Sequence, residues 1–220
     1  MTKYERDWDT YSAAWKGGSG QHLGDEWGDE AFTQIMVQRF CLPYLGEDTC
    51  VLEIGPGGGK YSVVLVERCK RLTIADVSQA MLDRTARRLK GWDRVTYVKL
   101  NGLDFEGVAG EAFDFVFSFD VFVHLDTEDI FCYLSEIKRM LKPHGVAAIH
   151  FANLLSPVGW DKFVKEAPRN RAEKKQIGRF NFVTPQIIEK FLHELTFAIV
   201  AIETEINGRD FMAVFRKHGA

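Results

Sequence analysis

Short apolar runs alternate with stretches of helical periodicity through the middle of the chain. A short run of mostly apolar residues predicts a buried strand, whereas apolar residues spaced three or four apart predict an amphipathic helix. The predicted strands are residues 50–54, 72–75, 95–100, 113–118 and 146–151. Because helical patterns separate them, we predict an α/β fold, a doubly wound parallel sheet with helices on both faces.

Capping and breaking residues place the helices between these strands. Ser78 and Thr127 are suitable N-caps, and prolines 43 and 143 mark helix ends because proline cannot continue a helix. Gly145 supports the second of these ends. The helices are predicted at about 29–42, 60–69, 78–91 and 127–143.

The C-terminal part predicts a change of strand direction. A helix is predicted at about 184–195, and two strand patterns follow at 197–205 and 210–217. The dipeptide Asn207-Gly208 between them is a strong hairpin signal. A C-terminal antiparallel hairpin added to five parallel strands predicts a mostly parallel seven-stranded sheet.

Two segments stand outside this alternation within the single domain predicted for residues 1–220. Residues 1–35 hold three of the five tryptophans, which predicts an aromatic arm that packs on the core or acts as a lid. Residues 154–183 form an insertion, in which 161–180 has seven basic residues against three acidic ones. We expect this insertion to be either a solvated helix face or a cover over the binding site of an anionic substrate.

Composition narrows the class of protein. The 220 residues are 46% hydrophobic and 27% charged, which excludes disordered, collagen-like and coiled-coil classes. The net charge of −3 gives no general basic surface, so neither nucleic acid nor an anionic membrane is an expected partner. No apolar run reaches the ~18 residues of a membrane span, and the first residues lack the apolar centre of a signal peptide.

Four cysteines point to a reducing compartment. Cys41, Cys50, Cys69 and Cys132 form no CxxC pair and have no neighbouring histidine at zinc-ligand spacing. We therefore expect reduced thiols, no metal and a cytoplasmic location.

A glycine-rich loop, Glu53-Ile54-Gly55-Pro56-Gly57-Gly58-Gly59, directly follows the first predicted strand. It does not fit a P-loop, because that motif needs Gly where Ile54 stands and Ser or Thr where Tyr61 stands. It fits the dinucleotide fingerprint poorly, because Lys60 takes the position where the helix must pack closely on the strand. The remaining pattern is an acid at the end of a strand with glycines at alternate positions.

That pattern favours a cationic ligand. Gly55 and Gly57 would let the backbone approach a ligand where a Cβ would clash. The Glu53 carboxylate would repel a pyrophosphate but would attract an ammonium group. S-adenosylmethionine carries an ammonium and a sulfonium and has no phosphate.

With these motifs, residues 48–153 resemble the class I (seven-stranded, Rossmann-like) S-adenosylmethionine-dependent methyltransferases, small-molecule type, with a family-like tail to 217. The run 51–59 looks like the family's first motif, and 74–78 looks like its second. Residues 141–145 (LKPHG) look like the family's LKPGG turn with His144 for one glycine.

The resemblance implies a set of cofactor-binding residues. Asp76 stands where the family's ribose-binding acid lies, and Asn101 stands at its adenine-contacting position, which is usually Asp. The segment 113–120 and His124-Leu125 look like the fourth motif, whose backbone usually meets the methionine part. The implied cofactor contacts are Glu53, Gly55, Gly57, Gly59, Asp76, Val77, Asn101, Gly102, Phe119 and Asp120.

Two histidines are candidates for a general base. His124 follows the fourth strand and His150 lies near the end of the fifth, where ligands of such sheets bind. Either side chain could instead be packed without a catalytic role. Aromatic residues that could cap the pocket, although core packing is the common alternative, are Tyr11, Trp15, Trp27 and Trp160.

We therefore expect an enzyme that uses S-adenosyl-L-methionine to methylate an O or N atom of a small-molecule acceptor. A base is needed only if the acceptor is an alcohol or phenol. Two alternatives stay open: a methyltransferase that acts on protein or RNA through 161–180, and a non-methylating Rossmann-type dehydrogenase or scaffold.

Overall fold

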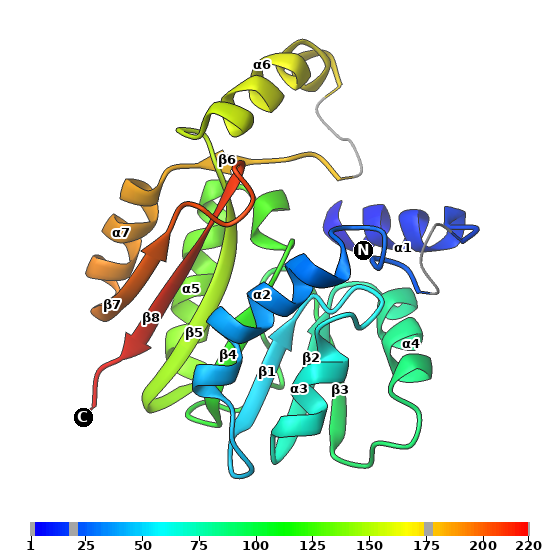
Figure 1. Ribbon diagram of the computed structural model, residues 1–220, viewed down its shortest axis with the longest axis vertical. Coiled ribbons are helices and arrows are strands. Elements are labelled where there is room, and N and C mark those ends of the chain that lie inside the picture. The colour runs from blue at the N-terminus through cyan, green and yellow to red at the C-terminus, as the bar shows by residue number, and fades with distance from the viewer. Residues whose placement is uncertain (1–2, 18–21, 174–177, 220) are drawn as a thin grey trace.

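One mixed β-sheet organises the molecule (Figure 1). The computed structural model describes residues 3–17, 22–173 and 178–219. Seven strands follow the order β3-β2-β1-β4-β5-β8-β7, and a short eighth strand, β6, pairs with β5. The strand bounds are β1 Cys50–Ile54, β2 Arg71–Asp76, β3 Val95–Lys99, β4 Phe113–Ser118, β5 Leu141–Asn153, β6 Phe182–Val183, β7 Phe197–Glu203 and β8 Asp210–Lys217.

Strand directions confirm the predicted mostly parallel sheet with a C-terminal hairpin. β1 pairs in parallel with both β2 and β4, and the parallel pairing extends to β3 and β5. β8 is antiparallel to both of its neighbours, β5 and β7. The chain order switches between β1 and β4, so the residues after these strands meet at the carboxyl edge of the sheet, where open α/β sheets bind ligands.

Helices cover both faces of the sheet, as predicted. One hydrophobic core lies beneath α5 and α7 and the other beneath α2, α3 and α4. Successive residues of a strand face opposite sides, so Ile149 of β5 belongs to the first core and Ala148 to the second. The helix bounds are α1 Lys3–Ala14, α2 Glu30–Phe40, α3 Ser62–Arg68, α4 Gln79–Arg88, α5 Thr127–Met140, α6 Pro157–Ala172 and α7 Pro185–Glu194, with 3₁₀ turns η1 Leu42–Tyr44 and η2 Phe122–His124.

The predicted limits of α5 were wrong at both ends. Asp126, not Thr127, occupies the N-cap position, and the helix stops at Met140. Pro143 lies inside β5, although the sequence predicted it as the end of a helix. The strand tolerates this proline because the pairing between β4 and β5 shifts register beside it, and prolines within sheets are found at such irregularities.

Both segments outside the strand–helix alternation contain a helix. The N-terminal arm forms α1, which Arg84 of α4 holds through the Ser12 side chain at 2.8 Å and its carbonyl at 2.6 Å. The insertion forms α6, which begins at a Ser156 cap and projects from the carboxyl edge of the sheet (Figure 1). A helix face was one of the expectations for the insertion, but the bounds of neither helix were predicted, because neither has the continuous apolar stripe of a helix packed on a sheet.

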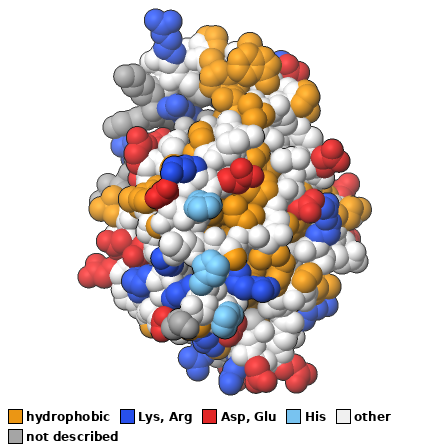
Figure 2. Space-filling model, turned by 90° about the vertical axis from the view of Figure 1, so that its left-hand side faces the viewer, with side chains coloured by type: hydrophobic (Ala, Val, Ile, Leu, Met, Phe, Trp, Pro, Cys, Tyr) orange, Lys and Arg blue, Asp and Glu red, His pale blue; other side chains and the backbone are white. Residues whose placement is uncertain are grey.

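Hydrophobic side chains gather at the end of the molecule that α6 occupies (Figure 2). Trp160 is 53% exposed and Leu155 is 61% exposed.

Within the described part of the chain, no helix has the length and apolar character to cross a membrane.

β8 lies between β5 and β7, so its buried side chains should contribute strongly to the stability of the fold. Phe215 is fully buried, and its ring centroid lies 4.8 Å from that of Phe197. We expect Phe215→Ala to lower the free energy of unfolding by about 3–5 kcal/mol, as measured by urea denaturation, because it leaves a cavity in a closed core. Val200→Ala on the edge strand β7 is the control, and should cost less than about 1 kcal/mol because Val200 is 46% exposed.

Candidate functional site

A cavity lies at the carboxyl edge of the sheet, where β1, β2 and β4 end. We call it the inner cavity. The glycine-rich loop, both strand-end acids and residues of α1 line it, so the N-terminal arm and the sheet share one site. Lining residues that were predicted for the cofactor are Glu53, Gly55, Gly57, Asp76, Val77, Phe119 and Asp120.

Glu53 lies in β1 and is almost fully buried at 2% exposure. Burial raises the pKa of its carboxyl to about 7, although a hydrogen bond from the Ser62 hydroxyl, at 2.5 Å, opposes this shift. The nearby charge of Asp76 raises the pKa further. A carboxylate in this position is stabilised by any cation that enters the cavity.

Asp76 ends β2, the neighbouring strand, and is 7% exposed. Burial raises its pKa to about 7 as well, although the Ser78 backbone N–H donates to its Oδ1 at 2.7 Å. Register explains why the two acids share one cavity, because Ile54 pairs with Ala75 directly before Asp76.

The glycines of the loop serve different purposes. Gly57 has φ 59° and open space beside it, so its backbone is accessible to a ligand. Gly55 has φ 69°, and a Cβ there would lie 2.2 Å from Val121 Cγ2, so glycine is required for packing. Gly58, which the sequence did not single out, is equally restricted, because a Cβ would lie 2.0 Å from the Leu23 carbonyl oxygen. Gly59 lies outside the cavity lining and packs against Thr85.

Asn101 and Gly102 follow β3 but do not line the inner cavity. The Asn101 side-chain oxygen accepts hydrogen bonds from the backbone N–H groups of Leu103 and Asp104, at 2.7 and 3.0 Å. Asn101 thus builds a turn, while Leu100 lines the cavity. Gly102 adopts φ 81° in the same turn.

An outer cavity of about 680 Å³ adjoins the inner one. Its volume falls in the ~300–1,000 Å³ range of small-molecule pockets. The two cavities share the side chains of Trp8, Trp27, Phe119, Asp120 and His124. Other lining residues of the outer cavity include Tyr11, Asp29, Phe32, Phe180, Asn207 and Arg209.

His124 stands where the two cavities meet. Its Nδ1 lies 2.9 Å from the carbonyl oxygen of Arg179. A carbonyl can only accept, so this contact requires Nδ1–H and leaves Nε2 as the basic nitrogen. Burial lowers the pKa of His124, so the ring is neutral at pH 7. Asn181 holds η2 from the same segment, because its backbone N–H donates to the Val123 carbonyl at 2.7 Å.

His150 has a different environment and lines neither cavity. It is fully buried, its ring centroid lies 4.1 Å from that of Phe119, and it lies between two carboxylates. Its Nδ1 is 3.3 Å from Asp120 and its Nε2 is 3.3 Å from Asp210. Burial lowers the pKa of His150, but the two carboxylates more than offset this, so the pKa is raised. His150 therefore holds other groups in place rather than facing a substrate.

The sequence did not identify Asp210 and Arg209 as site residues. Arg209 donates to both oxygens of Asp210, with contacts of 2.7 and 2.9 Å from Nε and 2.5 Å from a terminal nitrogen. In the sequence they stand beside a hairpin signal and were interpreted only as part of that hairpin. They reach the site because β8 pairs with β5. Ligand atoms of Asp120, His150 and Asp210 lie within 4.8 Å of one another, but a metal ion would have to compete with Arg209 for Asp210.

The predicted capping aromatics divide into two groups. Tyr11 and Trp27 line the outer cavity. Trp15 instead stacks under Arg84 and donates to Glu26 at 3.1 Å, and Trp160 is exposed on α6.

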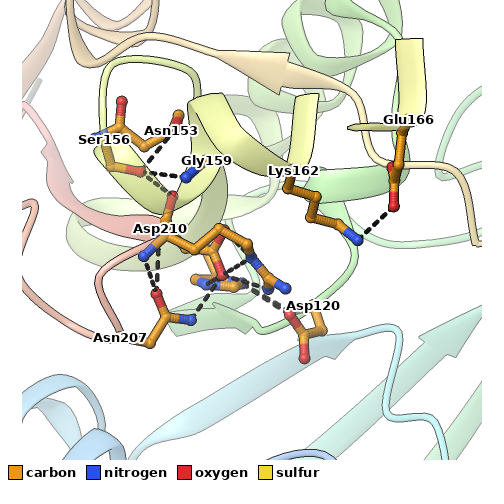
Figure 3. Close-up of polar contacts among 10 residues, drawn as sticks. Asp120, Asn153, Ser156, Gly159, Lys162, Glu166, Asn207 and Asp210 are labelled. Atoms are coloured by element: carbon orange, nitrogen blue, oxygen red, sulfur yellow. Dashed lines mark hydrogen bonds and ion pairs between the residues drawn. The ribbon is translucent and has the colours of Figure 1, made fainter. Parts of the chain in front are cut away.

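The described basic residues of 161–180 differ in their surroundings. Lys162 pairs with Glu166 at 2.6 Å (Figure 3), whereas Lys165, Arg169 and Arg171 are exposed on α6. Lys174 and Lys175 lie outside the described residues.

Residues 51–145 match the family model described as "Methyltransferase domain". The chain is 34% identical over 98 residues to protein-L-isoaspartate O-methyltransferase of Nitrobacter winogradskyi, covering 39% of this chain and 45% of that protein. It is 30% identical over 95 residues to nodulation protein S of Rhizobium tropici, covering 43% of this chain and 39% of that protein. The chain thus spans less than half the length of either relative.

Solved structures share the fold over nearly the whole chain. The N-methyltransferase NodS from Bradyrhizobium japonicum WM9, in complex with S-adenosyl-L-homocysteine, aligns with a TM-score of 0.66 at 20% identity, covering 99% of both chains. The complex of the Haloferax volcanii Trm112 methyltransferase activator with a methyltransferase gives a TM-score of 0.74 at 14% identity, covering 99% of this chain and 98% of that one. The match to the methyltransferase domain runs from β1 to the start of β5, and the fold shared with these solved structures extends over nearly the whole chain.

Proposed function

We propose that the protein transfers a methyl group from S-adenosyl-L-methionine to an O or N atom of a small-molecule acceptor. The observation that carries this proposal is the presence of Glu53 and Asp76 in one cavity beside an open glycine backbone. The likeness to NodS supports it, because NodS is an N-methyltransferase and its structure contains S-adenosyl-L-homocysteine.

The residues present fit this cofactor. The buried Glu53 carboxylate has a raised pKa and lacks an ion pair among the described residues, which suits an ammonium group. Asp76, at the end of the next strand, suits the two ribose hydroxyls. When bound, the cofactor supplies a methyl group that its positive sulfur already activates.

The protein itself would orient the two reactants, exclude water from the site and remove a proton from the acceptor. Trp8 and Tyr4 of α1 close the inner cavity, which supports a lid role for the N-terminal arm. Holding two reactants in the reactive orientation can lower the activation free energy by about 7–11 kcal/mol. His124 Nε2 faces the junction of the cavities and would take a proton from the acceptor, while the Arg179 carbonyl keeps the other nitrogen protonated.

The outer cavity would hold the acceptor. Residues from both ends of the chain enclose it, which favours a small molecule over a macromolecule. We propose no nucleic-acid substrate and a cytoplasmic location, because the net charge is −3 and the four cysteines are free.

Ligand binding tests the cofactor assignment. We expect S-adenosyl-L-homocysteine to bind in calorimetry and NAD not to bind, because the two acids would repel a pyrophosphate. Asp76→Asn and Glu53→Gln should each weaken the binding of S-adenosyl-L-homocysteine roughly 10-fold or more, which is the loss of about 1.4 kcal/mol expected for a buried charged contact. Glu203→Gln, on the exposed side of β7, is the control. Unchanged affinity in both acid variants, with the fold intact by circular dichroism, would refute the assignment.

The raised pKa values predict how this affinity depends on pH. Both acids have a pKa of about 7 in the free protein, so they are mostly neutral at pH 6 and ionised at pH 8. The ligand's ammonium needs an ionised Glu53, so affinity should rise roughly 10-fold from pH 6 to 8. Stability of the ligand-free protein should move the opposite way, because a raised folded pKa contributes stability that is lost as pH rises through 7. Glu53→Gln should flatten the affinity profile, and a flat profile in the wild type would contradict the prediction.

Replacement of His124 tests the general base. With an acceptor found by screening for S-adenosyl-L-homocysteine release, His124→Gln should lower kcat by roughly 100-fold or more. Because burial lowers the pKa of His124, the wild-type kcat should be constant above pH 7. The affinity for S-adenosyl-L-homocysteine should stay within about 2-fold. His193 is exposed on α7, so the control His193→Gln should change neither kcat nor this affinity. An unchanged kcat in His124→Gln would show that His124 is not the general base.

A further inference from the structure

Asp120 holds an unusual position between the two cavities. It follows β4 with φ 57°, a left-handed conformation that Asp adopts more readily than most residues with a side chain. The Asp120 side chain lines both cavities.

The neighbours of Asp120 satisfy its carboxylate only in part. Among the described residues, its Oδ1 is buried and makes no hydrogen bond. The nearest opposite charge is His150, whose Nδ1 lies 3.3 Å from Asp120 Oδ1 and 3.2 Å from the Asp120 backbone nitrogen. The same ring also faces Asp210, 3.3 Å from its Nε2, so one imidazole is shared between two carboxylates. The proximity of His150 outweighs burial and lowers the pKa of Asp120, so the carboxylate is ionised at neutral pH.

Three cations near the two cavities already have hydrogen-bond partners. Arg209 donates to both oxygens of Asp210. Lys60 donates to the carbonyls of Trp27 and Gly28, at 2.8 and 2.7 Å. Lys162, beyond Phe180, pairs with Glu166 (Figure 3). A cationic acceptor would supply the hydrogen-bond donor that Asp120 Oδ1 lacks among the described residues.

Aromatic faces add to this preference. The outer cavity has six aromatic side chains in its wall, and ring faces attract organic cations. Phe180 already shows this behaviour, because Arg209 lies 4.4 Å and Lys162 4.5 Å from its ring centre. Trp8 and Trp27 carry the aromatic wall to the junction with the inner cavity.

We propose that the acceptor is an amine that enters as its ammonium form, and that Asp120 and the aromatic wall of the outer cavity bind this positive charge. The inference rests on the proposed function and narrows it from an O or N atom to a basic nitrogen.

The proposed step balances in atoms and charge. The ammonium gives one proton to His124 Nε2, and the nitrogen lone pair becomes available. This pair forms the new N–CH₃ bond as the S–CH₃ bond breaks, and the electrons of the broken bond remain on sulfur as the neutral thioether. The methylated nitrogen carries the positive charge again, so Asp120 stabilises both the entering and the leaving form. His124 then releases its proton to solvent.

A pair of probes that differ only in charge tests the cation site. Choline and 3,3-dimethylbutan-1-ol have the same shape, with a quaternary nitrogen in one and a carbon in the other. We expect the protein saturated with S-adenosyl-L-homocysteine to bind choline at least 10-fold more tightly than the neutral alcohol, by calorimetry or ligand-observed NMR. Asp120→Asn should abolish the preference while keeping the left-handed backbone, which Asn tolerates.

An acid outside both cavities provides the control. Asp83 is exposed on α4, where its Oδ1 accepts from the Gln79 side chain at 2.9 Å. The choline preference should therefore survive Asp83→Asn. Equal binding of the two probes by the wild type, or a preference that survives Asp120→Asn, would overturn the inference.

Methyl transfer gives an independent measurement. In a panel of arylalkyl amines, which are ammonium ions at pH 7, with their matched alcohols and carboxylates, S-adenosyl-L-homocysteine release should be confined to the amines. Release only from alcohols or carboxylates would also overturn the inference. Failure to bind S-adenosyl-L-homocysteine would instead refute the proposed function, so the two failures are distinguishable.

Discussion

Burial of negative charge at the carboxyl edge of the sheet is the constraint on which the rest of the site depends. Glu53 and Asp76 are held there by two paired strands, and their raised pKa values measure how strongly the surroundings disfavour ionisation. A rigid sheet can sustain this because its own hydrogen bonds and two hydrophobic cores stabilise it independently. The acids are thus kept in a state that a positively charged ligand relieves.

A second set of charges connects the far end of the chain to this edge. β8 enters the sheet beside β5, so Asp210 at its first residue lies next to His150, and His150 in turn contacts Asp120 after β4. Arg209 closes the set through Asp210. The antiparallel strand thereby supports both the sheet and the wall of the outer cavity.

Local patterns were sufficient for the sheet and for the inner cavity. The alternation of strands and helices gave most strand limits closely, although β5 begins at Leu141 rather than at 146 and β6 was not predicted. The position of Glu53 and Asp76 at strand ends placed both in the inner cavity. Contacts between distant segments were beyond such patterns. Nothing near Asp210 or Arg209 in sequence indicates that pairing with β5 will bring them beside His150. Asn101 shows the converse, because a residue at the expected position uses its side chain to build a turn.

The wall of the outer cavity combines Trp8 near the N-terminus with Phe180 and Arg209 near the C-terminus. The lining of the inner cavity, by contrast, ends at Tyr133. During synthesis on the ribosome, every residue that lines the inner cavity is therefore translated before Phe180 and Arg209, which complete the wall of the outer cavity. A nascent chain thus carries all the side chains of the inner cavity well before those of the outer cavity are complete.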